Sequence, residues 1–312
     1  MTDRTQSGAS SNRPSLSFGS WAFAFGPFEP APWPLQRVAE YLADAGYDAI
    51  EINGFRPHPH DEDFDTPKKC VPLRELLDGL GLAISGYAPD FRSTPPADVA
   101  LGDYLARIDS ALAFCRNMQI SILRTDTVSP PGPMDEERFE RLITAWRAAA
   151  GHAEDSGVRL IWEFEPGFWL NRPSQVVRAV EEVDHRNFSV LFDSSHAFTG
   201  AVMGARQGAD PEILPGGVAE YARLLSGHIG HLHLIDSDGS LHNDETSSHL
   251  PFGQGRIDFD ELVEAIPDEL FALPFWTVDF CFCETAEADG RDAVGFVREL
   301  LNHADDPQEV VR

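Results

Sequence analysis

Eight short apolar segments recur along this chain of 312 residues, and their regular spacing limits the folds open to it. They begin near residues 20, 47, 82, 119, 158, 188, 229 and 275 and are rich in β-branched or aromatic residues. Alanine- and leucine-rich stretches with helical spacing, such as residues 35–46 and 140–157, lie between most of them. Alternating strands and helices at this spacing predict an α/β protein with a parallel sheet.

A closed barrel and an open doubly wound sheet both alternate strands and helices. An open dinucleotide-binding sheet carries a glycine-rich turn after its first strand, but "FAFGPFEPAPWP" stands there in this chain. Three long connections, 55–70, 197–217 and 236–258, follow predicted strands, where barrel enzymes build their active sites. We therefore predict one (β/α)8 TIM barrel over residues 17–302 with extended loops at the C-terminal face of its strands. Residues 1–16 are predicted to be a disordered tail, and 303–312 a C-terminal tail.

The composition excludes some partners. With 24 Lys and Arg against 51 Asp and Glu, the net charge is −27, which repels nucleic acid and anionic membranes. The four cysteines suggest reduced packing residues, and neither a signal peptide nor a membrane-spanning run is visible. We expect a globular cytoplasmic protein.

Polar side chains gather where the last four predicted strands end. Glu163, Asp193, His233 and Asp279 come one from each of four consecutive strands. Because neighbouring parallel strands lie about 4.8 Å apart, inward side chains at these ends can surround one ion. Carboxylate and imidazole ligands without thiolate suit Mn²⁺, Mg²⁺ or Co²⁺, and Zn²⁺ as well.

The motifs "VRLIWEFEPG", "FSVLFDSSH", "HLHLIDSDG" and "HLPFGQGRIDF" resemble those of the xylose isomerase-like barrel superfamily over roughly residues 17–302. That superfamily includes sugar phosphate isomerases, ketose 3-epimerases, inosose dehydratases and AP endonucleases. The resemblance implies metal ligation by Glu163, Asp193, His233 and Asp279, with Mn²⁺ the first choice. It also selects His233 rather than His231, and it places His196 where epimerases bind substrate.

The resemblance implies enolisation of a sugar. A divalent ion polarises a carbonyl while a carboxylate removes the neighbouring proton. We expect Glu163 to be the base and Asp279 the opposing acid/base group, with Glu284 the alternative to Asp279 and His196 assisting. The family commonly has glutamate at position 279, so the shorter aspartate leaves the second acid/base group open.

Other residues are candidates for substrate binding. We expect Glu51, Trp169 and His249 to contact substrate. His249 corresponds to a metal ligand of the AP endonucleases, but Ser247 replaces their aspartate, so we predict no three-metal cluster. Asp236 has three readings: substrate contact, orientation of His233, or the start of a turn.

The leading hypothesis is a metal-dependent sugar isomerase or epimerase of carbohydrate metabolism. The alternative is a lyase with the same chemistry, either a C-glycoside deglycosidase acting on 3-oxo-glycosides or an inosose dehydratase. Cleavage of damaged DNA is disfavoured by the negative charge, and a non-catalytic, metal-stabilised barrel is the remaining reading. The expected partners are a carbohydrate and further subunits in a homo- or hetero-oligomer.

Overall fold

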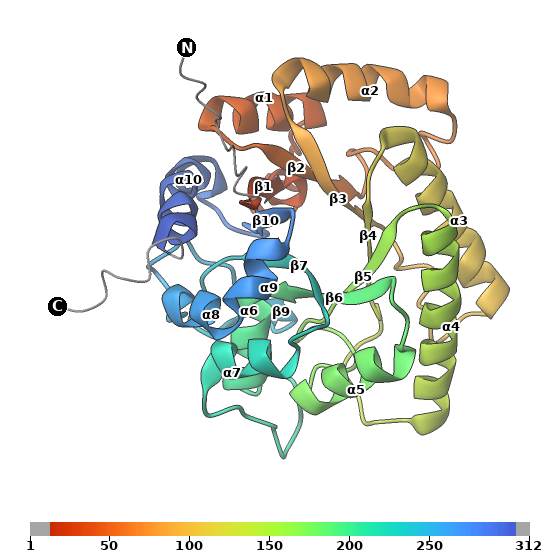
Figure 1. The fold of residues 1–312 in the computed structure, drawn as a ribbon, viewed down its shortest axis with the longest axis vertical. Helices are drawn as coiled ribbons and strands as arrows, with labels where there is room; N and C mark the ends of the chain where they lie inside the picture. Colours follow the sequence, from red (N-terminus) through yellow and green to blue (C-terminus); the bar gives the residue numbers. More distant parts are fainter. Residues whose placement is uncertain (1–12, 304–312) are drawn as a thin grey trace, which may run out of the picture.

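The computed structural model describes residues 13–303, and eight parallel strands form a closed barrel in them (Figure 1). This confirms the predicted (β/α)8 architecture. Around the barrel the strands follow the order β1, β10, β7, β6, β5, β4, β3 and β2. Their bounds are β1 Ser15–Gly19, β2 Ala49–Gly54, β3 Ala83–Pro89, β4 Ile122–Thr125, β5 Arg159–Glu163, β6 Phe188–Asp193, β7 Ile229–Leu234 and β10 Phe275–Val278.

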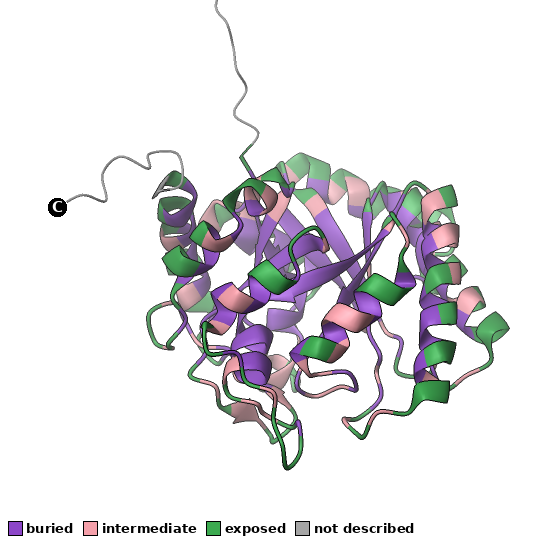
Figure 2. Ribbon diagram, turned by 60° about the horizontal axis from the view of Figure 1, so that its bottom comes forward, coloured by how far each residue is buried: buried purple, intermediate pink, exposed green. Residues whose placement is uncertain are grey.

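Helices surround the barrel with their buried sides toward it and their exposed sides outward (Figure 2). The major ones are α1 Leu35–Ala45, α2 Pro67–Leu80, α3 Leu101–Met118, α4 Glu136–Asp155, α5 Pro173–Val183, α7 Gly217–Leu224, α8 Phe259–Ala265, α9 Pro267–Ala272 and α10 Ala286–His303. Helix α1 illustrates the sequence logic: it buries Val38, Ala39 and Leu42 and ends at Gly46, whose φ of 94° favours glycine. No helix within residues 13–303 is long and apolar enough to cross a membrane.

The first strand differs from its prediction. The predicted segment "SWAFAFG" is not a strand: β1 ends at Gly19, and Ser20–Phe23 form the 3-10 helix η1. This turn directs the Trp21 indole toward the barrel axis, where its Nε1 donates a 2.7 Å hydrogen bond to Asp279. The barrel therefore begins at Ser15, two residues before the predicted boundary. The predicted tails lie largely outside the described residues, which exclude 1–12 and 304–312.

The long connections lie at the C-terminal ends of the strands, as the sequence predicts. The connection after β6 holds the short helix α6 Ser194–Ala197 and the π-helix η3 Phe198–Val202. The connection after β7 contains a small hairpin of β8 Leu241–His242 and β9 Thr246–Ser247. Residues far apart in the sequence meet at this end of the barrel.

Candidate metal centre

Four side chains from consecutive strands meet at the C-terminal face of the barrel. Glu163 and Asp193 end β5 and β6, His233 lies in β7, and Asp279 follows β10. Asp193 and His233 are opposite each other in the β6–β7 register. All four are buried, and each offers one ligand atom within 4.8 Å of the others. The structure thus brings together the four residues that the sequence predicted as a set.

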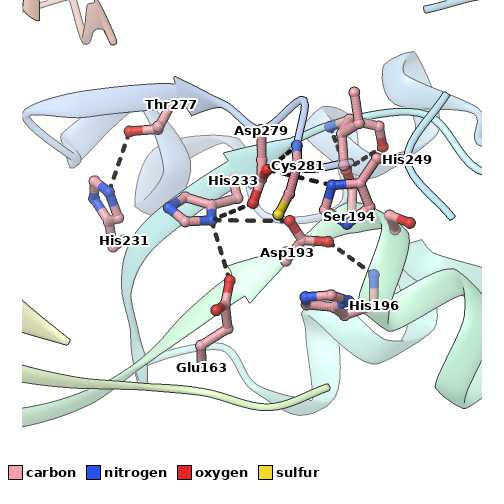
Figure 3. A network of polar contacts seen from close by, with 12 residues as sticks. Glu163, Asp193, Ser194, His196, His231, His233, His249, Thr277, Asp279 and Cys281 are labelled. Carbon is pink, nitrogen blue, oxygen red and sulfur yellow. Dashed lines mark hydrogen bonds and ion pairs between the residues drawn. The ribbon is translucent and has the colours of Figure 1, made fainter. Parts of the chain in front are cut away.

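His233 Nδ1 is central to this cluster (Figure 3). It lies 3.1 Å from Glu163 Oε1, 3.5 Å from Asp279 Oδ2 and 3.9 Å from Asp193 Oδ2. Burial alone would lower the pKa of His233, but Glu51 and the surrounding carboxylates outweigh burial and raise that pKa well above its usual value. The cluster therefore attracts positive charge strongly.

The atoms that face one another in the cluster have no polar partner outside the cluster. Glu163 Oε1, Asp193 Oδ2 and His233 Nδ1 are all buried and face only one another and Asp279. Buried polar atoms in native proteins are nearly always well paired, so three such atoms that converge without regular hydrogen bonds indicate a site for another group. Three carboxylates and one imidazole are hard oxygen and nitrogen donors, which suit Mn²⁺, Mg²⁺, Co²⁺ or Zn²⁺. The residues present therefore fit a divalent ion.

Asp193 has two separate tasks because its two oxygens face different groups. Its Oδ1 accepts a 2.8 Å hydrogen bond from the backbone N–H of His196 and so caps helix α6. Its Oδ2 faces the cluster. Helix capping and metal ligation, which are alternatives in the sequence, are compatible in the structure.

A buried carboxylate contacts the other nitrogen of the His233 ring. Glu51 Oε2, from β2, lies 3.1 Å from His233 Nε2 and 2.8 Å from His231 Nε2. Burial opposes the charged form of Glu51, but the two imidazoles outweigh it and lower the pKa of this carboxyl. Gly86 of β3 provides the space, because a Cβ at that position would lie 3.3 Å from the Glu51 carboxyl carbon.

Asp279 is held by several donors through the oxygen that does not face His233. Its Oδ1 accepts hydrogen bonds of 2.7 Å from Trp21 Nε1 and 2.8 Å from the Cys281 backbone N–H. His249 Nδ1 lies 3.2 Å from the same oxygen. The other ring nitrogen of His249, Nε2, is buried without a hydrogen-bond partner. His249 also forms a second candidate ligand group with Asp193 and His196.

The β8–β9 hairpin is tied to neighbouring loops by polar contacts. Thr246 Oγ1 donates a 2.5 Å hydrogen bond to Glu165 Oε2, and Ser247 Oγ lies 2.6 Å from His196 Nδ1. Burial is the main reason that the pKa of Glu165 is raised. Through Glu165 and His196, the hairpin forms part of one side of the candidate site.

Arg124, in β4, is a site residue that the sequence did not reveal. Its Nη1 lies 2.5 Å from Glu163 Oε2, while its Nε and Nη2 donate to the Asp126 carboxylate at 3.1 and 3.2 Å. Burial alone would raise the pKa of Glu163, but Arg124 and His233 outweigh it and lower that pKa. A charged residue within a predicted strand, one position before the observed end of β4, was the available signal.

Comparison with known proteins identifies the family. The sequence profile described as xylose isomerase-like TIM barrel matches residues 39–300. The chain belongs to this family. The resemblance inferred from the sequence motifs is therefore confirmed.

Members of the xylose isomerase-like TIM barrel family that resemble this chain include sugar 3-epimerases. Fructoselysine 3-epimerase of Escherichia coli O157:H7 is 26% identical over 246 residues, which cover 75% of this chain and 82% of that protein. Inosose dehydratase of Geobacillus thermodenitrificans strain NG80-2 is 22% identical over 255 residues, covering 74% and 76%. The structure of L-ribulose 3-epimerase matches with a TM-score of 0.70 at 17% identity and covers 96% of this chain and 98% of that one. This last match shows a shared fold.

In this member of the xylose isomerase-like TIM barrel family, several expected substrate contacts have other partners. The Asp236 carboxylate accepts hydrogen bonds from four backbone N–H groups, those of Ser237, Gly253, Gly255 and Ile257. Trp169 is buried, with its Nε1 donating to Pro133 O at 3.3 Å. Glu284 is exposed, whereas Asp279 belongs to the cluster. Of the three roles considered for Asp236, these contacts favour the last, in which Asp236 begins a turn.

Proposed function

We propose that this protein is a divalent-metal-dependent isomerase or epimerase that acts on a keto sugar or a related polyol. The observation that carries the proposal is the convergence of Glu163 Oε1, Asp193 Oδ2 and His233 Nδ1, all buried and with no polar partner outside the cluster. The relatives named as sugar 3-epimerases support the same class of reaction. Glu163, Asp193, His233 and Asp279 would hold the ion, for which Mn²⁺ is our first choice. When bound, a divalent ion would polarise the sugar carbonyl and stabilise the negative charge that develops beside it.

Glu163 is the proposed base for the carbon-bound proton. Its Oε2 is held by Arg124, which fixes the carboxylate in one orientation. Because the side chain of Glu163 is already fixed in this way, it loses little further conformational freedom when the substrate binds. Because Arg124 and His233 lower the pKa of Glu163, the carboxylate is ionised and ready to accept a proton at neutral pH.

Return of a proton to the opposite face of the carbon requires a second group. Asp279 is the proposed residue, working together with His249, whose Nδ1 lies 3.2 Å from Asp279 Oδ1. The two hydrogen bonds from Trp21 and Cys281 prevent this carboxylate from rotating freely. The His249 ring therefore extends the reach of an aspartate that is one methylene shorter than the family's glutamate.

His196 and Glu165 are proposed to contact the sugar hydroxyl groups. His196 Nε2 lies 3.8 Å from Glu165 Oε2, and the hairpin holds each of the two side chains through a hydroxyl group. An imidazole and a carboxyl at this spacing offer both a donor and an acceptor to a polyol.

A lyase is the second candidate, favoured by the inosose dehydratase among the relatives. The same proton abstraction by Glu163 leads to elimination when the substrate carries a leaving group beside the carbanion. Incubation with an inosose and with 3-oxo-C-glycosides, followed by chromatography, distinguishes the lyase from an epimerase. A product that has lost water or the aglycone would show that the protein is a lyase and would contradict our first proposal.

The direct test is proton exchange. Purified protein loaded with Mn²⁺ is incubated in deuterated water with a panel of keto sugars, and carbon-bound deuterium is measured by mass spectrometry. We expect label in at least one sugar and, in Glu163→Gln, a loss of rate of about 10²–10⁴-fold. Glu137→Gln is the matched control, because Glu137 is exposed in the first turn of α4. Unchanged exchange in Glu163→Gln would contradict its role as the base.

The cytoplasmic location and the assembly into a homo- or hetero-oligomer stay predictions from the sequence. The proposed partner is a small carbohydrate. Gel filtration combined with light scattering measures the mass of the assembly directly.

A further inference from the structure

A hydrogen-bonded triad lies beneath the metal centre in the barrel interior. It consists of Glu51, His231 and His233, all three with 0% exposure. One oxygen, Glu51 Oε2, is within hydrogen-bond distance of both Nε2 atoms. Thr277 Oγ1 lies 3.2 Å from His231 Nε2 on the neighbouring strand β10. Burying a carboxylate costs free energy, so its retention here calls for a role.

The triad determines which nitrogen of His233 carries hydrogen. An ionised carboxylate can only accept hydrogen bonds, so His231 and His233 each donate an Nε2–H to Glu51. When a metal ion takes the place of the second proton, His233 keeps its N–H at Nε2 toward Glu51 and offers its lone pair at Nδ1. This is the atom that faces Glu163, Asp193 and Asp279.

The alternative that the triad holds a second ion is less consistent with its geometry. Its three polar atoms are close enough to share an ion. However, their separations of 2.8 and 3.1 Å from Glu51 Oε2 are ordinary hydrogen-bond lengths. An ion bound there would also take the Nε2 lone pair of His233. The unpartnered nitrogen of that ring is Nδ1, on the other side.

We propose that Glu51 is a positioning residue that fixes the tautomer and orientation of His233 for the metal ion, and that His231 holds Glu51 in place. This inference rests on the proposed function, because it takes His233 as a metal ligand. The sequence predicted that Glu51 contacts substrate, whereas this proposal has Glu51 contact the metal ligand His233. Carboxylates that orient a metal-bound histidine in this way typically change metal affinity 10- to 100-fold when they are removed.

The test measures metal binding without any substrate. Wild-type protein, Glu51→Leu and Glu51→Gln are stripped of metal and titrated with Co²⁺ against a competing chelator, while the visible absorption spectrum of bound Co²⁺ is recorded. Glu51→Leu should lower the affinity about 10–100-fold and alter the spectrum, because His233 loses its acceptor. Glu51→Gln keeps an acceptor oxygen in nearly the same volume and should recover most of the affinity. Ser85→Ala is the matched control, because Ser85 is buried and its hydroxyl contacts Ser17 Oγ at 2.6 Å.

A second pair of variants tests the same idea from His231. His231→Gln retains an N–H donor for Glu51 and should bind Co²⁺ nearly as tightly as the wild type, whereas His231→Leu should bind more weakly. Circular dichroism and thermal melts check the fold of every variant, and this pair decides the question if Glu51→Leu does not fold.

The outcomes separate the two proposals. Equal Co²⁺ affinity and spectra for the wild type, Glu51→Leu and His231→Leu would overturn the positioning role and leave the proposed function intact. A wild-type protein that binds none of Mn²⁺, Co²⁺, Mg²⁺ or Zn²⁺ would overturn both.

Discussion

Arg124 joins two acidic side chains of different strand ends, Asp126 and Glu163. In the protein without a metal ion, its guanidinium is the nearest fixed positive charge to Glu163. Arg124→Gln should therefore lower the free energy of unfolding of the metal-free protein by about 3 kcal/mol, because it removes the guanidinium that pairs with two buried carboxylates. Urea denaturation measures the change.

The matched control for this prediction is Arg178→Gln. Arg178 also pairs with two carboxylates, those of Glu136 and Glu182, but the three side chains are exposed. Solvent screens such pairs, so this variant should unfold at nearly the wild-type urea concentration. Equal effects at positions 124 and 178 would argue against a special role for the buried arginine.

Asp61 gives a pH-dependent prediction away from the candidate metal centre. Burial opposes its charged form, but Arg107 outweighs burial with help from Ser110 and Tyr87, and the pKa of Asp61 is lowered. A carboxyl with a lowered folded-state pKa stabilises the protein fully above its unfolded value of about 3.9 and stops doing so as the pH falls through the folded value.

The Asp61 effect is measured as a difference between two proteins. The wild type should be more stable to urea than Asp61→Asn at about pH 7, and the gap should narrow as the pH falls below about 4. A gap that stays constant between these pH values would show that the contribution of Asp61 does not come from its charge.

Single residues also show the limit of reading a site from a sequence. The four cluster residues are predictable because each follows a recognisable strand, and parallel strands end at one face. The pairing of Glu51 with His231 is different, because it joins residues 180 positions apart across the barrel. Only the closed arrangement of strands, with its register, brings such side chains together.

At the scale of elements, the connection after β7 is organised by Asp236. Its two oxygens accept hydrogen bonds from backbone N–H groups on both sides of the connection. Asp236→Ala would leave these groups unpaired, so residues 246–257 should exchange their amide hydrogens faster, and turnover should fall because His249 lies within this stretch.

Hydrogen exchange followed by mass spectrometry measures this loosening. Asp238→Ala is the control, since Asp238 is exposed and accepts from Ser240 N within its own turn. Exchange rates in Asp236→Ala that match those of Asp238→Ala would contradict an organising role.

The elements also show why prediction fails at strand boundaries. The run "SWAFAFG" has the aromatic content of a strand, yet its first residues form η1. The true strand "SLSFG" contains serines that face the polar barrel interior, where Ser17 Oγ contacts Ser85 Oγ at 2.6 Å. Hydrophobicity alone therefore placed β1 about five residues too late.

For the whole molecule, a bound ion should couple to stability. Three buried carboxylates repel one another unless a cation lies between them, so an ion that binds only the folded state stabilises it. At a free Mn²⁺ concentration of about a hundred times its Kd, the gain is about 2.7 kcal/mol. Thermal melts in EDTA and after addition of Mn²⁺ measure the gain, and identical melting temperatures would contradict the proposed metal centre.

The closed barrel could be predicted because its repeat is a property of the whole chain. Eight strand and helix units leave a pattern that survives errors in any one element, and the confirmed strand order follows the sequence around the barrel. The detailed hydrogen bonding of loops follows from no such repetition, so the contacts of Asp236 with backbone N–H groups and of Trp169 with Pro133 could not be predicted.

Gly86, which has no side chain, also shapes the surroundings of the candidate metal centre. A methyl group at this position would lie 3.3 Å from the carboxyl carbon of Glu51 and would have to push it aside. In the proposed metal centre, a displaced Glu51 would no longer orient His233, so we expect the size of residue 86 to affect how the ion is held. Position 86 is therefore a place where the proposed metal preference could be altered without changing any side chain that would bind the ion.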